Sequence, residues 1–299
     1  MTANMDNSTG KSQRILLAED SITYQRLAVG LLEKLGHTVV VAENGAEVLE
    51  LLDRDSDFDL VLMDVLMPLM DGLEATREIR RREQSNAQHM PIIAVTGNTA
   101  SDDRNDCFAA GMDDFVLKPI RLSDIQLAIV RAAQFRNSRS DTSAASDQWS
   151  ADEGESKNLC RHYAVAIKAV AGDKLLLRQV VLASLDEFPE QLAIMSSSLN
   201  AGKFEELRRA AHTMKGTLRL FDARQLSALA MQLSTANDES DVNVLHETLS
   251  KLNAEFDLLR PQLKYLASWI TEELEKEHPP QNSDFQVYAD DNFKKSGSS

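Results

Sequence analysis

The sequence is poor in cysteine, in aromatic residues and in long apolar runs. Its 299 residues include two cysteines, Cys107 and Cys160, which are too few for a disulfide framework and do not form a CxxC pair. Aromatic residues make up 5% of the chain, so its cores must be built mainly from aliphatic side chains. No apolar run approaches the length of a bilayer span, and residues 1–13 hold no apolar signal segment. These absences predict a reducing, cytoplasmic location.

Positive charge is also scarce. Lys and Arg number 32 against 47 Asp and Glu, which gives a formal net charge of −15. Binding to nucleic acid through its phosphates needs clustered Lys and Arg, so we expect no DNA binding, and we expect no membrane association either. The arginine cluster at positions 77, 80, 81 and 82 is interpreted as the solvated face of a helix.

Hydrophobic residues at 43% and charged residues at 26% are typical of globular proteins, and the length suits two domains. Residues 14–135 alternate short apolar runs with helical patterns. The apolar runs are residues 14–18, 37–42, 59–63, 91–95 and 113–117. Nearly continuous apolar runs are typical of strands buried on both faces of a parallel sheet. We therefore predict an α/β domain with a doubly wound, five-stranded parallel sheet, whose ligands bind at the carboxyl ends of the strands.

The second half of the chain has a different character. Residues 158–277 show long amphipathic helical patterns, which favour an all-α domain with a four-helix-bundle core. The predicted helix breaks are residues 172–173, Pro189, and residues 200–202, 221–222 and 237–238. Three polar segments are predicted to lack fixed structure: a flexible N-terminus at 1–13, a flexible linker at 136–157 and a disordered tail at 278–299.

Polar residues follow four of the five predicted strands. They are Glu19 and Asp20, then Asp64, then Thr96, then Lys118. Loops after parallel strands meet at one edge of the sheet, where three carboxylates would repel one another unless a hard cation such as Mg²⁺ joined them. The lysine and the threonine hydroxyl suit a phosphoryl group. The pattern indicates nucleophilic attack by a carboxylate on phosphorus, with positioning and charge neutralisation carrying most of the rate.

Residues 14–133 resemble a receiver domain, the phospho-accepting module of two-component signalling, and are similar to the chemotaxis response regulator. The matching strings are ILLAED (15–20), MDVLMPLMDG (63–72), AVT (94–96) and DFVLKP (114–119). The resemblance implies a flavodoxin-like fold with a phosphoryl acceptor, metal ligands, a phosphate-binding lysine and a switch pair. The phosphoryl acceptor would be Asp64, and the phosphate-binding lysine would be Lys118. The switch pair would be Thr96 and Phe115, which replaces the Tyr often found there. The implied ligands of Mg²⁺ are Glu19, Asp20, Asp64 and the backbone carbonyl of Leu66.

A single histidine stands out in the helical half. His212, Lys215 and Gly216 lie at i, i+3 and i+4 of a predicted helix over 207–217, so they share a face. A neutral imidazole on an exposed helical face is a nucleophile near neutral pH. The lysine can offset the charge of an arriving phosphoryl group, and the glycine leaves room for a partner domain to approach the ring.

This half resembles a His-containing phosphotransfer (HPt) domain. The match rests on HTMKG (212–216), on residues 169–177 and on FPEQL (188–192). It implies a four-helix-bundle core in which His212 carries the phosphoryl group, with Lys215 and Gly216 beside it and with no metal or catalytic base of its own. Leu218 and Arg219 stand where small residues are common, and Asp222 replaces a frequent Gly. We therefore expect the segment after the histidine to pack or dock differently.

A receiver followed by an HPt domain resembles the C-terminal end of hybrid sensor kinases, here without a kinase ATP site. With Met1 and a short polar lead, the chain reads as an independent shuttle or as a fragment of such a kinase. We expect a monomeric phosphorelay protein that is not a kinase. An upstream histidine kinase would phosphorylate Asp64, and His212 would exchange the group with that or another receiver aspartate. Two alternatives stay open: a phosphorylation-switched binding regulator whose bundle is the output, and a phosphate sink.

Overall fold

The computed structural model describes residues 12–277, except residues 56, 85–88, 98–100 and 138–162. The predicted N-terminal segment, linker and tail therefore lie outside the described residues, save for residues 12, 13, 136 and 137. The last two belong to a helix that continues to Asn137, so regular structure extends two residues into the predicted linker. In the described ranges, no helix combines the length and the apolarity that a bilayer crossing requires.

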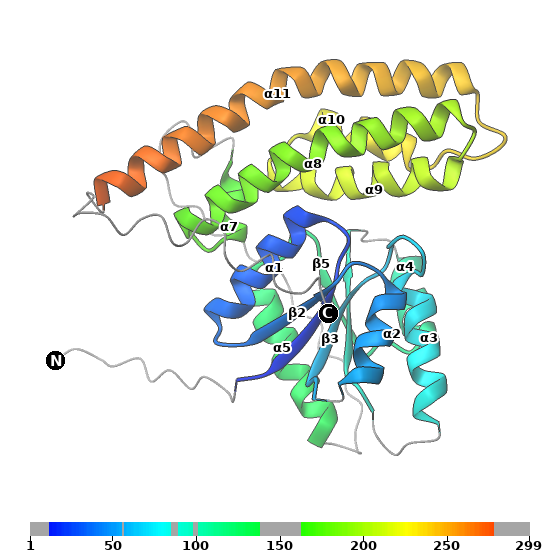
Figure 1. Cartoon of the computed structure of the whole chain (residues 1–299), viewed down its shortest axis with the longest axis vertical. Coiled ribbons are helices and arrows are strands. Elements are labelled where there is room, and N and C mark those ends of the chain that lie inside the picture. Colours follow the sequence, from blue (N-terminus) through cyan, green and yellow to red (C-terminus); the bar gives the residue numbers. More distant parts are fainter. Residues whose placement is uncertain (1–11, 56, 85–88, 98–100, 138–162, 278–299) are drawn as a thin grey trace.

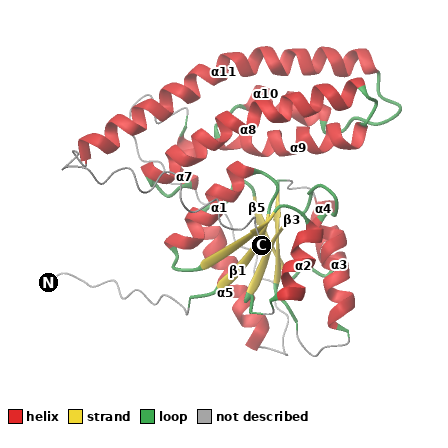
Figure 2. Ribbon diagram, viewed as in Figure 1, coloured by secondary structure: helices red, strands yellow, loops and turns green. Residues whose placement is uncertain are grey.

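Residues 14–137 form a parallel sheet with helices on both faces (Figure 2). The sheet order is β2-β1-β3-β4-β5, and every neighbouring pair is parallel. The strands are β1 (Arg14–Ala18), β2 (Thr38–Ala42), β3 (Leu60–Asp64), β4 (Ile92–Thr96) and β5 (Asp114–Leu117). The helices are α1 (Ile22–Lys34), α2 (Gly45–Arg54), α3 (Gly72–Glu83), α4 (Ser101–Ala110) and α5 (Leu122–Asn137). The predicted doubly wound α/β fold is confirmed.

Alternating strand residues feed two separate cores. Leu17 and Leu62 face the core that contains α1 and α5, whereas Leu16 and Val61 face the core that contains α2 and α3. This alternation follows from the two-residue period of a strand, and it explains why the strand sequences are apolar at nearly every position.

The second unit is a helical bundle, as predicted. Its helices are α7 (Ala164–Ala169), α8 (Lys174–Asn200), α9 (Phe204–Leu220), α10 (Arg224–Leu233) and α11 (Val242–Glu277). The four longest pack in a ring, in which α8 touches α9 and α11, and α10 touches the same two helices. The all-α domain with a four-helix core is therefore confirmed.

Pro189 does not end a helix, so that predicted break is wrong. Helix α8 runs through it from Lys174 to Asn200. A proline in a helix interior costs about 3 kcal/mol, because it removes one backbone donor and crowds the preceding turn. Phe188, Leu192 and Met195 flank it and are buried in the bundle core. Full burial of such side chains contributes about 1.5–3 kcal/mol each, which outweighs the local penalty.

The bundle lies across the α/β unit at α1, as Figure 1 shows. Leu176 of α8 packs on Gly30 of α1 so closely that a β-carbon on that glycine would come 2.4 Å from the leucine Cδ1. Lys34 and Asp173 add an ion pair of 3.3 Å at the rim of the contact. The apolar core on the α1 face of the sheet continues without interruption into the bundle core.

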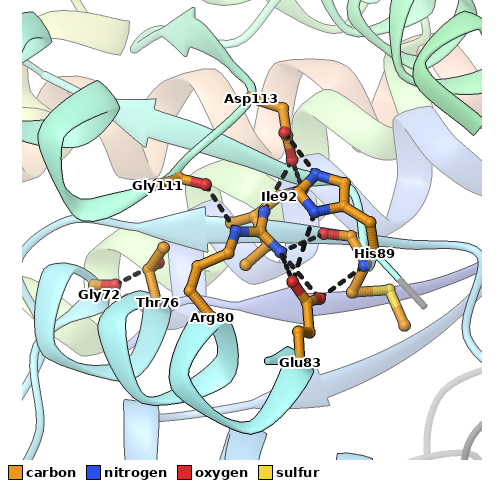
Figure 3. A network of polar contacts seen from close by, with 9 residues as sticks. Gly72, Thr76, Arg80, Glu83, His89, Ile92, Gly111 and Asp113 are labelled. Atoms are coloured by element: carbon orange, nitrogen blue, oxygen red, sulfur yellow. Dashed lines mark hydrogen bonds and ion pairs between the residues drawn. The ribbon is translucent and has the colours of Figure 1, made fainter. Parts of the chain in front are cut away.

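A network of polar contacts joins α3 to the edge of the sheet at which β4 and β5 begin (Figure 3). Arg80 donates to the carbonyl oxygens of Gly111 (2.8 Å) and Met90 (2.9 Å), and it forms ion pairs of 2.8 Å with Glu83 and Asp113.

Asp113 is the second centre of the same network. Its Oδ2 also accepts from the backbone amide of Ile92 at 2.8 Å, and its Oδ1 lies 2.7 Å from the imidazole Nε2 of His89. The side chain of Arg80 is 17% exposed and that of Arg81 is 69% exposed. The interpretation of the arginine cluster as a solvated face is therefore wrong for Arg80, which joins elements far apart in the sequence.

Replacing Arg80 by alanine is expected to destabilise the α/β unit by about 2–4 kcal/mol, because Asp113 and Gly111 lose the donor that they share. The change would be measured as faster amide hydrogen exchange in β4 and β5. Arg81→Ala is the matched control, since it removes an exposed pair with Glu78 on the same helix. Equal exchange rates in the two variants would contradict a structural role for Arg80.

Candidate functional site

Three carboxylates meet at the carboxyl edge of the sheet. Glu19 and Asp20 follow β1, and Asp64 is the last residue of β3, the strand beside β1. One ligand oxygen from each lies within 4.8 Å of the others. Glu19 is 1% exposed and Asp64 is 3% exposed, so two of the three negative charges are buried.

Lys118 is held against these carboxylates by the end of β5. Its Nζ lies 2.7 Å from Asp64 Oδ2 and 2.6 Å from Glu19 Oε2. Its backbone amide donates to the carbonyl oxygen of Thr96 at 2.7 Å, which places the lysine beside the end of β4. Thr96 is 4% exposed. The structure thus brings together the five predicted residues from four strands.

The acidic cluster carries more negative charge than Lys118 balances. Burial and the nearby Asp64 charge raise the pKa of Glu19 above its usual range. The same two causes, in the same order, raise the pKa of Asp20 to about 7. Buried carboxylates resist ionisation when their charges are crowded. A small group of oxygen ligands with surplus negative charge fits a hard divalent cation such as Mg²⁺.

Two further predicted residues lie at the margin of this cluster. Phe115 in β5 packs edge-on against Phe108 of α4, with ring centroids 6.3 Å apart, and the Arg104 guanidinium lies 4.0 Å above its ring. Leu66 lies in the loop that follows β3, and its side chain is 40% exposed. The predicted role of its backbone carbonyl stays a prediction.

His212 lies in the middle of α9, where the bundle meets the α/β unit. Its Nδ1 is 3.3 Å from Lys215 Nζ. The lysine is only 3% exposed, and its Nζ also contacts Met231 Sδ at 3.7 Å. The expected exposed helical face is therefore wrong for the docked chain, because the α/β unit covers it.

The imidazole of His212 faces the loop after β4. A β-carbon on Gly97, the residue after Thr96, would lie 3.8 Å from His212 Nε2 and 3.8 Å from Arg219 Nη1. The Arg219 guanidinium donates to the Gly97 carbonyl oxygen. The next hydroxyl along α9, that of Thr213, donates to Asp20 Oδ2 at 3.3 Å. The predicted histidine and the acidic cluster therefore share one interface.

The charge state of His212 follows from this position. Burial, and after it the positive charge of Lys215, lowers its pKa to about 4, although the Asp64 carboxylate acts in the opposite direction. The ordinary value for histidine is about 6.5. The ring is therefore neutral at physiological pH, which is the nucleophilic form.

Tyr24 is a contact residue that the sequence analysis missed. Its hydroxyl donates to the Gly216 carbonyl oxygen at 3.0 Å, and Lys118 Nζ lies 4.5 Å from its ring centre. A β-carbon on Gly216 would lie 3.4 Å from Tyr24 Cε2, at the lower limit of ordinary van der Waals contact. The predicted reason for the glycine, close approach of a partner domain, stays a prediction.

Arg219 and Thr213 were also not assigned to the site. Arg219 is a large residue at a position after the histidine where small residues are common, and that departure is a usable signal. A threonine beside a histidine carries no signal of its own, because its contact with Asp20 depends on a domain nearly two hundred residues away in the chain.

The comparisons with known proteins match each half of the chain separately. The model of the response regulator receiver domain matches residues 15–130, and the model of the Hpt domain matches residues 179–262. The chain carries a receiver domain followed by an Hpt domain. This pair of domains supports a role in two-component phosphorelay signalling, and neither matched family is a kinase domain. Receiver domains generally bind Mg²⁺, and the acidic cluster fits that property.

Its similar proteins include hybrid histidine kinases. Hybrid signal transduction histidine kinase K of Dictyostelium discoideum is 41% identical over 128 residues, which cover 41% of this chain and 10% of that protein. Histidine kinase 5 of Arabidopsis thaliana is 36% identical over 38% of this chain and 15% of its own length. The chain therefore spans a small part of these relatives. A solved receiver domain from a Pseudomonas aeruginosa sensor histidine kinase, described with magnesium in its active-site cleft, is 36% identical with a TM-score of 0.38, covering 42% of this chain and 99% of its own.

We expect the His212 ring to titrate near pH 4 in the docked chain, because burial and Lys215 both oppose its protonation. At pH 6 an exposed histidine is largely protonated, whereas His212 stays neutral. Imidazole nitrogen shifts in a histidine-labelled sample would report the midpoint. In Gly30→Gln, whose side chain collides with Leu176, the midpoint should move back toward 6.5. A wild-type midpoint near 6.5 would contradict the buried position.

Proposed function

We propose that the chain is a phosphorelay protein that accepts a phosphoryl group on Asp64 and exchanges it with His212 inside one docked molecule. The observation that carries the proposal is the shared interface: Thr213, next to His212, donates to Asp20 of the acidic cluster at 3.3 Å, and His212 Nε2 faces the loop that follows Thr96. In this proposal the receiver domain spans residues 14–135 and the Hpt domain spans residues 158–277.

The first step is attack by an Asp64 carboxylate oxygen on the phosphorus of a phosphodonor. A new O–P bond forms, the bond from phosphorus to the donor breaks, and the leaving group keeps the electron pair. Lys118, already 2.7 Å from Asp64 Oδ2, is placed to hold a phosphoryl oxygen as a fixed positive charge. Glu19, Asp20, Asp64 and the Leu66 carbonyl would hold Mg²⁺, which supplies neutralisation of the phosphoryl charge when bound.

The second step is transfer to the histidine. The lone pair of His212 Nε2 attacks phosphorus, an N–P bond forms, and the O–P bond to Asp64 breaks to return the carboxylate to Lys118. This requires a neutral ring with its lone pair on Nε2 and its proton on Nδ1, so the Lys215 ammonium, a donor 3.3 Å from Nδ1 in the docked chain, must turn from Nδ1 toward the phosphoryl group before transfer. The lowered pKa of His212 supports the neutral form. Lys215 offsets the charge of the phosphoryl group, while Gly216 admits Tyr24 and hence the receiver domain.

The partners follow from this chemistry. A histidine kinase upstream is the donor to Asp64, and the aspartate of another receiver domain downstream accepts from His212. Thr96 and Phe115 form the switch pair of the receiver domain, which reports the state of Asp64 to its surface. Both acceptors lie on one chain, so a monomer suffices for the exchange.

Acetyl phosphate and Mg²⁺ are expected to label wild-type protein first on Asp64 and then on His212, as acid-labile phosphohistidine. Asp64→Asn should give neither product, and His212→Gln should retain the aspartyl phosphate. Gly30→Gln should label Asp64 normally but transfer at least about tenfold more slowly, since a loss of 1.4 kcal/mol in docking is a factor of ten. Glutamine is a better helix former than glycine, so α1 itself remains folded. Mass spectrometry of each site over time is the measurement. Phosphohistidine in the Asp64→Asn variant would contradict the proposed transfer from Asp64 to His212.

Chelation of divalent cations is expected to abolish labelling of Asp64. Without the cation, Lys118 is, among the described residues, the one positive charge placed to neutralise both the phosphoryl group and the three carboxylates. Titration calorimetry should show that Asp20→Asn weakens Mg²⁺ binding at least about tenfold, since a ligand oxygen loses its charge. Asp53→Asn is the matched control, because that exposed residue pairs with Arg82 on the surface. Equal Mg²⁺ affinity in the two variants would show that the acidic cluster is not the metal site.

A further inference from the structure

A buried carboxylate of the Hpt domain lies in the domain interface, outside the groups that exchange phosphate. Glu187 of α8 is 3% exposed. Its Oε2 accepts from the hydroxyl of Thr23, in α1 of the receiver domain, at 2.6 Å. Thr217 of α9 donates to the same oxygen at 3.4 Å, and Ser184 lies one turn earlier on α8 with its Oγ 3.3 Å from the Thr23 hydroxyl.

The receiver domain completes the surroundings of this carboxylate. Burial of a carboxylate is strongly unfavourable unless donors replace the lost water. Burial raises the pKa of Glu187, and the hydrogen bond from Thr23 is the leading influence in the opposite direction. Thr23 is the second residue of α1, whose first turn holds no acidic side chain of its own. The helix dipole there also favours a negative charge.

The hydroxyl of Thr23 is the feature that an apolar residue cannot replace. A receiver domain with an apolar residue at this position would cover Glu187 without its leading donor, leaving only the weaker hydrogen bonds from Ser21 and Thr217. Docking of such a domain would bury the Glu187 carboxylate without its strongest hydrogen bond. The docking free energy of the mismatched partner would therefore be less favourable, while that of the matched partner would be unchanged. A receiver domain with a serine or threonine there would satisfy it.

We propose that the Glu187–Thr23 contact is the pairing determinant by which this Hpt domain selects receiver domains, with its own receiver domain as the matched partner. The inference rests on the proposed function and deepens it, because it defines the partner class: receiver domains with a hydroxyl three positions after the second acidic metal-ligand position, here Asp20. Both residues are positioning residues, since neither touches Asp64 or His212 through any contact among the described residues.

A double-mutant cycle in the full chain tests the pairing. Thr23→Val keeps the side-chain shape and removes the donor, so it should slow Asp64-to-His212 transfer about tenfold or more, the usual effect of losing a hydrogen bond to a charged group. In the Glu187→Met background the same Thr23→Val change should have almost no effect, because no carboxylate remains to be satisfied. Labelling of Asp64 by acetyl phosphate should be equal in all variants.

Matched substitutions separate this effect from general damage. Thr38→Val makes the same change at an exposed position that starts β2, and Glu190→Met makes the same change on the exposed face of α8. Both should transfer at the wild-type rate. If Thr23→Val and Glu187→Met instead act independently, so that their rate effects multiply, the pairing inference is overturned while the relay stands.

Hydrogen exchange of the α1 amides gives a second readout that does not need transfer. Docking should protect these amides in wild type, and Thr23→Val should reduce that protection in the parent chain but not in the Glu187→Met background. If the wild-type α1 amides are protected by docking but phosphohistidine never forms, the proposed relay is refuted and the Glu187–Thr23 pairing still stands. Equal loss of protection in both backgrounds would refute the pairing.

Discussion

Three carboxylates share the carboxyl edge of one parallel sheet, and their mutual repulsion is the constraint to which the surrounding structure responds. Lys118 reaches two of them, but the pKa values of Glu19 and Asp20 stay raised, so the cluster remains ready for further positive charge. The site therefore suits a divalent cation, and in the proposed relay it is where the phosphorylated aspartate would be held. His212 lies opposite the cluster as a neutral ring, because burial and the positive charge of Lys215 both oppose its protonation.

The docked bundle turns this cluster from a surface feature into part of an interface. Helix α1 packs between the sheet and α8, and its side of the receiver core is continuous with the bundle core. The apolar contact of Leu176 with Gly30 buries surface between the two domains. Tyr24 and Thr23 add directed hydrogen bonds to the Hpt domain. The same helix thus fixes both how tightly and in what orientation the two domains meet.

The sequence predicted what depends on local pattern. Strand positions, the acidic cluster and the motif around His212 all follow from short-range periodicity and from the rule that strand ends converge. Pro189 was misassigned because a local helix-breaking preference was outweighed by burial of its neighbours Phe188 and Leu192. The role of Arg80 was misjudged and that of Glu187 was missed for another reason, which is that their partners come from elements distant in the sequence. The sequence around a single charged residue does not indicate which element will cover it.

The docked arrangement also has a consequence for timing. While the receiver domain covers His212, the face of α9 that carries this histidine is closed to any other receiver domain. In the proposed relay, delivery to a second partner must wait until the first domain leaves, so the two exchanges would occur one after the other. In the proposed relay, the dissociation rate of α1 from α8 then limits the rate of delivery, and the rim pair of Lys34 and Asp173 affects that rate from outside the reacting groups.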